Sequence, residues 1–254
     1  GTQVPDLAAI GEFCREHGLL YVVDNTITSP ALFRPASVGA GLVVNSLTKT
    51  IAGHGAALGG AVTDTGRFDW SGYPNLFGAY RTGDAGGWGL AQIRKKGLRD
   101  LGAALAPEQA HRISLGAETL MLRTTQSSRT ALTLARFLEA HPAVARVHYP
   151  GLASHPQHGV ASALFSAGSW LLSFELKDPS TLSATMNRLR LAVLATGLGD
   201  TRTLVIPVAP TIFWEAGAEV RAEMGIADGL IRVSLGLEDE ADVIADFAQA
   251  LGGD

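Results

Sequence analysis

The chain has 254 residues, of which 46% are apolar and 17% charged, and its formal net charge is −4. This size and apolar content are enough for a sizeable core in one large or two modest domains. The small negative charge gives no attraction to nucleic acid or to an anionic membrane, and no apolar run reaches the ~18 residues of a membrane-spanning helix.

The beginning of the chain has neither an initiator Met nor a signal-peptide pattern. Pro5 and Asp6 are typical of a helix start, so a helix begins almost at once. We therefore expect a piece of a longer protein. Cys14 is the only cysteine, which excludes an internal disulfide and suits a cytoplasmic location.

The first part of the chain alternates between helical and strand patterns. Residues 5–17 predict an amphipathic helix that ends at Gly18. Three apolar segments follow and predict buried strands, at residues 19–25, 41–46 and 57–64. This order favours an α/β layered domain with a mainly parallel sheet.

Polar side chains follow two of these strands. Asp24 ends the first strand, and Ser46, Thr48 and Lys49 stand at the end of the second. In sheets of this kind, ligands bind beyond the carboxyl ends of the strands. The sequence therefore places these four residues at one candidate site.

The second part of the chain predicts a smaller α+β domain. Residues 66–106 have no regular pattern, and Pro107 then opens a long helical stretch with Gly116 as a possible break, so we divide the chain into domains 1–106 and 107–254. Strand patterns and helical patterns alternate in the remainder, with strands at 144–150, 169–176, 191–200 and 230–238 and helices at 180–190 and 239–251.

Three interpretations fit a lysine after a strand end with hydroxyls beside it. Lys49 is either an ordinary surface lysine, part of a phosphate loop, or a lysine that forms a Schiff base with pyridoxal phosphate. The phosphate loop does not fit, because its glycines precede the lysine, whereas Gly53 and Gly55 follow it here. Pyridoxal phosphate also needs an acid near its pyridine nitrogen, which Asp24 can supply. Position alone leaves the first and third interpretations open.

The surrounding residues resemble the Cys/Met-metabolism family of pyridoxal-phosphate enzymes. The family pattern is Asp-Asn-Thr, then Pro, then Ser-x-Thr-Lys and Gly-His, and this chain carries it as Asp24, Asn25, Thr26, Pro30, Ser46, Thr48, Lys49, Gly53 and His54. The similarity continues through residues 95–123, 135–158, 198–206 and 230–251. The segment "LGDTRTL" is most similar to the O-acetylhomoserine sulfhydrylase branch.

The resemblance implies a fold-type I, aspartate aminotransferase-like enzyme with pyridoxal 5′-phosphate as its cofactor. Lys49 would bind the cofactor covalently and move protons on the substrate, and Asp24 would pair with the pyridinium nitrogen. Thr26, Ser46 and Thr48 would complete the cofactor site. On the substrate side it implies that Arg232, with Gly197 nearby, binds the α-carboxylate.

The family also implies an activity and an assembly. We expect γ-replacement on an O-acylhomoserine, with γ-elimination from methionine or cystathionine as the alternative within the family and a non-catalytic fragment as the alternative outside it. The expected partners are a small amino-acid substrate and further copies of the chain, in a homotetramer built from dimers. Neither nucleic acid nor membrane is expected.

Several positions depart from the family pattern. The upstream tyrosine and Tyr-x-Arg segment of the family do not occur in this chain, so we expect the chain alone to bind cofactor weakly and turn over poorly. Gly197 replaces the Ser or Asn of relatives, and Ala56 replaces an Asp that commonly follows Gly-His. His155 and His158, separated by a proline, are more typical of a loop than of a metal site, and we assign no metal.

Overall fold

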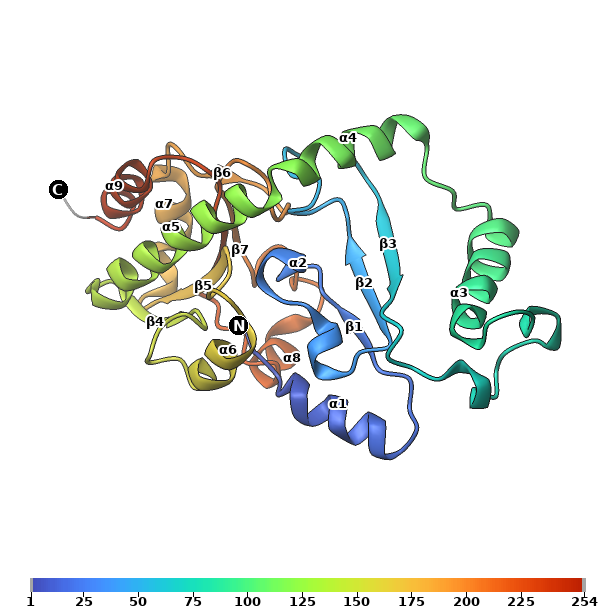
Figure 1. Ribbon diagram of the computed structural model, residues 1–254. Helices are drawn as coiled ribbons and strands as arrows, with labels where there is room; N and C mark the ends of the chain where they lie inside the picture. Colours follow the sequence, from blue (N-terminus) through green and yellow to red (C-terminus); the bar gives the residue numbers. More distant parts are fainter. Residues whose placement is uncertain (1, 253–254) are drawn as a thin grey trace.

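Two β-sheets organise the chain in the computed structural model, which describes residues 2–252 (Figure 1). The first sheet has the order β1-β2-β3, from strands Val22–Asp24, Leu42–Ser46 and Gly60–Asp64. Helix α1, Leu7–Glu16, precedes it, with Asp6 rather than Pro5 at its start: the Asp6 carboxylate accepts a hydrogen bond from Ala9 N at 3.0 Å.

The first sheet is parallel in only one of its two pairings. β1 runs parallel to β2, as predicted, but β2 pairs with β3 antiparallel. The connection between Ser46 and Gly60 contains turns and no crossover helix. Leu47 N donates to Gly59 O at 2.9 Å, which closes the two strand ends onto each other. A parallel arrangement would need a much longer crossover, so the chain folds back instead.

The second sheet is mostly antiparallel and has the order β4-β5-β8-β7-β6. Its strands are Val144–His148, Leu171–Leu176, Leu230–Ser234, Leu204–Pro207 and Val193–Leu194, and only β6 and β7 pair in parallel. Helices α5 (Leu120–Ala140), α7 (Leu182–Arg188) and α9 (Glu240–Ala250) pack against this sheet (Figure 1). This is the α+β arrangement that the alternating pattern predicts.

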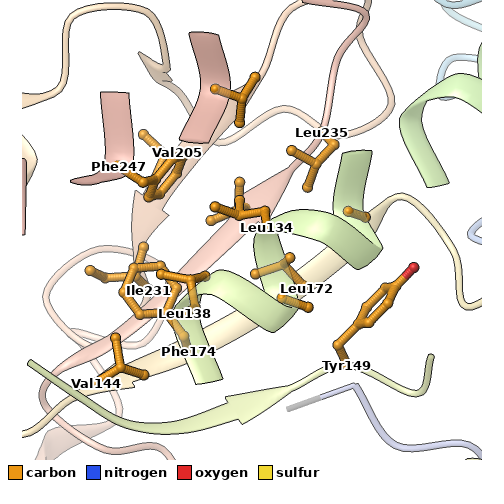
Figure 2. Packing of buried hydrophobic residues seen from close by; sticks show 14 of the residues in the cluster. Leu134, Leu138, Val144, Tyr149, Leu172, Phe174, Val205, Ile231, Leu235 and Phe247 are labelled. Carbon is orange, nitrogen blue, oxygen red and sulfur yellow. The ribbon is translucent and has the colours of Figure 1, made fainter. Parts of the chain in front are cut away.

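The main hydrophobic core lies between α5 and the second sheet. Leu134 and Leu138 of α5 are fully buried and lie near Leu172 and Phe174 of β5 (Figure 2). Phe247 of α9 joins the same core beside α5, with its ring 6.2 Å from that of Phe174 in an edge-to-face arrangement. The apolar residues of the two helices therefore fix the second sheet, and the smaller first sheet is attached through α4 and α5.

The predicted long helix is divided at Thr119. Helix α4 covers Pro107–Glu118, with Pro107 at the first helical position, and α5 begins at Leu120. The predicted break at Gly116 is therefore wrong by three residues. Gly116 is needed for another reason, because a Cβ atom at this position would lie 2.0 Å from Ala52 O. The helix thus packs directly on the backbone that follows Lys49.

The remaining elements are short. Sequence patterns did not predict the helices α2, α6 and α8, at Ser29–Leu32, His158–Leu164 and Gly217–Glu223, because each is at most two turns long. Residues 66–106, expected to be irregular, hold 3₁₀ turns, the helix α3 (Trp88–Gln92) and a π-helical turn, Ile93–Arg99. The 3₁₀ turns of this region are Trp70–Gly72, Gly78–Tyr80 and Ala85–Gly87, and others lie outside it at Pro35–Val38 and Pro179–Thr181. The predicted domain boundary coincides with the start of α4.

We expect Gly116→Ala to lower the free energy of unfolding by about 3 kcal/mol, since a methyl group placed against a backbone carbonyl forces α4 away from Ala52. Urea denaturation measures this difference. Gly159→Ala in α6 is the matched control, because a Cβ atom there meets nothing within 4 Å. Equal stability of the two variants would contradict the close packing of α4.

Candidate functional site

The candidate site begins at the paired carboxyl ends of β1 and β2. The register sets Asp24 opposite Val44, and Asn25 N donates to Val44 O at 2.8 Å. Lys49 follows Val44 by only five residues. The parallel pairing puts the carboxyl ends of β1 and β2 at the same edge of the first sheet (Figure 1). Asp24 ends β1, and Lys49 comes three residues after the end of β2.

Two buried asparagines hold this edge together. Asn25 and Asn45 are 2% and 6% exposed. Asn45 Nδ2 donates to Asn25 O at 2.9 Å, and Asn25 Nδ2 donates to Phe33 O at 3.0 Å. Because these amides satisfy backbone carbonyls that water does not reach, they fix the turn that leaves β1.

Thr26 links Asp24 to the end of β2. Thr26 N donates to Asp24 Oδ1 at 2.9 Å, and the Thr26 hydroxyl accepts a hydrogen bond from Ser46 N at 2.8 Å. Within residues 2–252, Asp24 Oδ2 accepts no hydrogen bond and the carboxylate forms no ion pair. Asp24 is exposed, so the second oxygen is available to a ligand.

The hydroxyl of Thr48 is engaged with the backbone. It accepts a hydrogen bond from Gly59 N at 3.1 Å and donates to Gly59 O at 3.3 Å. A phosphate oxygen that accepts a hydrogen bond from the Thr48 hydroxyl would replace only the 3.3 Å bond to Gly59 O. The bond from Gly59 N would stay, because the hydroxyl is the acceptor in that bond. Ser46 lies two residues earlier, and its hydroxyl has no recorded partner among the described residues.

Lys49 stands at the start of a tightly turned segment. Ala52 N donates to Leu47 O at 2.9 Å, and Gly53 N donates to Lys49 O at 2.8 Å. Three residues in the left-handed region follow, with φ of 62°, 59° and 60° at Gly53, His54 and Gly55. Glycine adopts this region readily, whereas His54 does so at a cost, so the turn is held by its surroundings. Lys49 is half-buried.

Gly199 of the second sheet's connecting loops lies against this segment. A Cβ atom on Gly199 would lie 2.7 Å from Thr50 N and 3.1 Å from the carbonyl carbon of Lys49. Gly199 N donates to the buried Ser234 Oγ at 2.9 Å, which ties the contact to β8. Gly199 is the glycine of the segment "LGD", which the sequence analysis noted. The sequence pattern alone did not show that this glycine lies against Thr50.

Arg232 and Gly197, the two residues predicted on the substrate side, are neighbours, and their role stays a prediction. Arg232 on β8 is half-buried, and its Nη2 donates to Thr196 O at 2.9 Å and to Gly197 O at 3.5 Å. Burial lowers the pKa of the Arg232 guanidinium from its ordinary value. Gly197 therefore contributes its backbone carbonyl to the placement of Arg232.

His155 and His158, the pair considered above as metal ligands, each form a hydrogen bond to nearby backbone. His155 Nδ1 accepts a hydrogen bond from Gln157 N at 3.2 Å, and His158 Nδ1 lies 2.9 Å from Pro150 O. Within residues 2–252, no three His, Cys, Asp or Glu side chains are arranged to hold a metal ion. In the same part of the chain, no helix has the length and apolar character needed to cross a membrane.

Comparisons with known proteins agree with one another. The family model described as Cys/Met metabolism PLP-dependent enzyme matches residues 1–252. O-acetyl-L-homoserine sulfhydrylase 1 of Thermus thermophilus is 39% identical over 261 residues, which cover 98% of this chain and 62% of that protein. L-methionine gamma-lyase of Pseudomonas putida is 38% identical over 248 residues, which cover 97% and 57%.

A solved structure shows the same fold. The O-acetylhomoserine (thiol)-lyase from Campylobacter jejuni, whose structure contains N′-pyridoxyl-lysine-5′-monophosphate, matches with a TM-score of 0.87 and 32% identity. The match covers 98% of this chain and 62% of that one. The fold is therefore the fold-type I arrangement that the resemblance implies, and the chain spans about three-fifths of the length of the relatives it matches.

The contact between Gly199 and Thr50 is testable with two alanine substitutions that share the same backbone cost. Gly199 and Gly225 have φ of 71° and 68°, but a Cβ atom on Gly225 meets nothing within 4 Å. We expect Gly225→Ala to cost about 1 kcal/mol of unfolding free energy and Gly199→Ala about 3 kcal/mol, because only the latter displaces the Lys49 segment. Chemical denaturation measures both values. A difference near zero would exclude the contact.

Proposed function

Because the chain belongs to the Cys/Met metabolism PLP-dependent enzyme family, we propose that it holds pyridoxal 5′-phosphate at the shared edge of β1 and β2. We propose further that the whole protein catalyses γ-replacement on an O-acylhomoserine. One observation carries the proposal: the parallel register puts a carboxylate, two hydroxyls and a lysine at adjacent strand ends.

The residues present fit this cofactor. Asp24 Oδ1 is oriented by Thr26 N, which leaves Oδ2 toward a ligand. The exposed Asp24 carboxylate can accept a hydrogen bond from a protonated ring nitrogen. The Ser46 hydroxyl can donate a hydrogen bond to the phosphate group. The Thr48 hydroxyl provides a second donor for the loss of its 3.3 Å bond to Gly59 O. Acid, amine and hydroxyl are the three groups that pyridoxal phosphate requires.

In this proposal each residue has one task. Bound pyridoxal phosphate supplies an electron sink for the negative charge that forms on the substrate α-carbon. The Asp24 carboxylate holds the ring nitrogen in its charged form, and the Lys49 amine removes and returns protons at the substrate carbons. Arg232 orients the substrate through its α-carboxylate, with the two-pronged geometry that guanidinium groups offer.

Replacement is favoured over elimination by the resemblance of "LGDTRTL" to the sulfhydrylase branch. A sulfhydrylase and a methionine gamma-lyase are nevertheless almost equally similar to this chain, at 39% and 38% identity. γ-Elimination from methionine or cystathionine is therefore the second candidate function. The candidate from another class, a fragment without catalysis, is distinguished by its lack of turnover with either substrate.

Assembly and location remain predictions. We propose the dimer-of-dimers assembly implied by the family and a cytoplasmic location, which follow from the resemblance and from the single cysteine respectively. Light scattering after size-exclusion chromatography measures the assembly.

Covalent capture tests the cofactor site. We expect pyridoxal phosphate to colour the protein yellow, borohydride to bleach it, and the pyridoxyl mass to appear on the peptide with Lys49. Lys49→Ala removes the labelled peptide, because the substitution removes the amine to which the proposal assigns the cofactor. Lys177→Ala is the matched control and leaves the labelling unchanged. Equal label on Lys49 and Lys177 in the unsubstituted protein would refute the site.

Product analysis tests the reaction. In the whole protein we expect sulfide and O-acetylhomoserine to give homocysteine faster than methionine gives methanethiol and 2-oxobutyrate. Asp24→Asn should slow the reaction by about 100-fold or more, because a neutral amide no longer stabilises the charged ring nitrogen. Faster release of methanethiol than of homocysteine would instead establish the second candidate function.

A further inference from the structure

Arg123 of α5 is a buried cation without an acidic partner. The residue is 8% exposed, and the described residues record no ion pair for its guanidinium. Burial lowers the pKa of Arg123 from its ordinary value, but an arginine in a protein stays charged. A buried charge is costly unless its donors are hydrogen-bonded, so the oxygens around Arg123 explain why it is there.

The four hydrogen bonds of the Arg123 guanidinium within residues 2–252 go to oxygens directly after Lys49 and at the end of α4. Nη1 donates to Thr50 O at 2.7 Å, and Nη2 donates to Ile51 O at 3.2 Å and to Gly116 O at 2.6 Å. Nε donates to the Thr119 hydroxyl at 3.0 Å. Three of the four acceptors are backbone carbonyls, and two belong to the residues directly after Lys49.

The oxygens of these carbonyls carry partial negative charge, which a cationic donor stabilises. Gly116 lies in the last turn of α4, where Thr119 N donates to its carbonyl at 3.3 Å and Arg123 adds a shorter second bond. Thr50 and Ile51 are buried in a turn. A cation at the carboxyl end of a helix is stabilised by its dipole. One guanidinium thus satisfies the turn after Lys49 and the end of α4 together.

Arg123 also lies in contact with the left-handed turn. A Cβ atom on Gly53 would lie 2.5 Å from Arg123 Nη1, so only glycine fits between the guanidinium and the turn. Together with Gly199, which contacts Lys49 and Thr50, Arg123 leaves the backbone from Lys49 to Gly53 little freedom to move.

We propose that Arg123 is a positioning residue for Lys49. Through Thr50 O and Ile51 O it sets the direction in which the lysine leaves the backbone, without touching cofactor or substrate. The inference rests on the proposed function of Lys49 and deepens it. Because a displacement of about 1 Å can cost up to ~100-fold in rate, a support of this kind affects chemistry as well as stability.

The test compares three variants with the unsubstituted chain. Arg123→Gln removes the charge and the planar set of guanidinium donors. Arg123→Lys keeps the charge but not this planar set of donors. Arg129→Gln is the matched control on the same helix, where the exposed Arg129 lies 3.8 Å from Glu240. Each is labelled with pyridoxal phosphate and borohydride, and Lys49 is compared with Lys177 in the same molecules.

We expect the ratio of label on Lys49 to label on Lys177 to fall about tenfold in Arg123→Gln and less in Arg123→Lys, and to stay unchanged in Arg129→Gln. Loss of folding would also lower this ratio, because selective label on Lys49 needs the folded site whereas Lys177 is exposed, so the ratio is compared only among variants that urea denaturation shows to be folded. An unchanged ratio in a folded Arg123→Gln would overturn the proposal. Where that variant does not fold, an unchanged ratio in Arg123→Lys would do so.

Hydrogen exchange separates this inference from the proposed function. In Arg123→Gln and Arg123→Lys we expect the amides of Ala52 and Gly53 to exchange at least tenfold faster, while those of β8 keep their rates. Absence of selective label on Lys49 in the unsubstituted chain refutes the proposed function alone. Unchanged exchange at Ala52 and Gly53 refutes the role of Arg123, whatever the labelling shows.

Discussion

The parallel register of β1 and β2 is the constraint on which the candidate site depends. It sets Asp24 opposite Val44, and the hydrogen bond from Ser46 N to Thr26 Oγ1 continues the alignment past the strand ends. Side chains alternate between the two faces of a sheet, so a slip of one residue would turn the Asp24 carboxylate away from the face it now occupies. Asn45 opposes such a slip, because the hydrogen bond from its side-chain amide to Asn25 O crosses between the two strands and depends on this register.

Close backbone approach is the second constraint, and it joins the two sheets. Gly116 of α4 meets Ala52, and Gly199 meets Thr50, at distances where no side chain fits. Contacts of this kind need no side chain to hold a conformation, so they restrict the segment without the rotamer entropy that a long side chain would lose. The backbone from Lys49 to Ala52 is therefore packed against residues that lie far from it in the chain.

Sequence patterns predict the parts of this arrangement that depend on neighbouring residues in the chain. The strands at Asp24 and Ser46 follow from short apolar runs, and the site residues at their ends follow from the geometry of parallel sheets. The antiparallel β3, the true helix boundary at Thr119 and the short helices depend on contacts outside any short window. Arg123 shows the limit most clearly: in sequence it is one more arginine of an ordinary helix, and its partners Thr50 and Ile51 lie 73 and 72 residues away. The roles of all the site residues, from Asp24 and Lys49 to Arg232, came from resemblance to a family and stay predictions.

The segment from Thr196 to Gly199 connects the substrate side of the proposed site with the cofactor side. At one end its carbonyls accept hydrogen bonds from Arg232, and at the other Gly199 lies against Lys49 and Thr50. Ser234, two residues after Arg232 on the same strand, accepts from Gly199 N, so β8 holds both ends of the segment. A shift of β8 relative to the first sheet must therefore move Arg232 and press on the backbone of Lys49 at the same time. Because the two positions share one rigid connection, a substitution at either end changes the geometry of both.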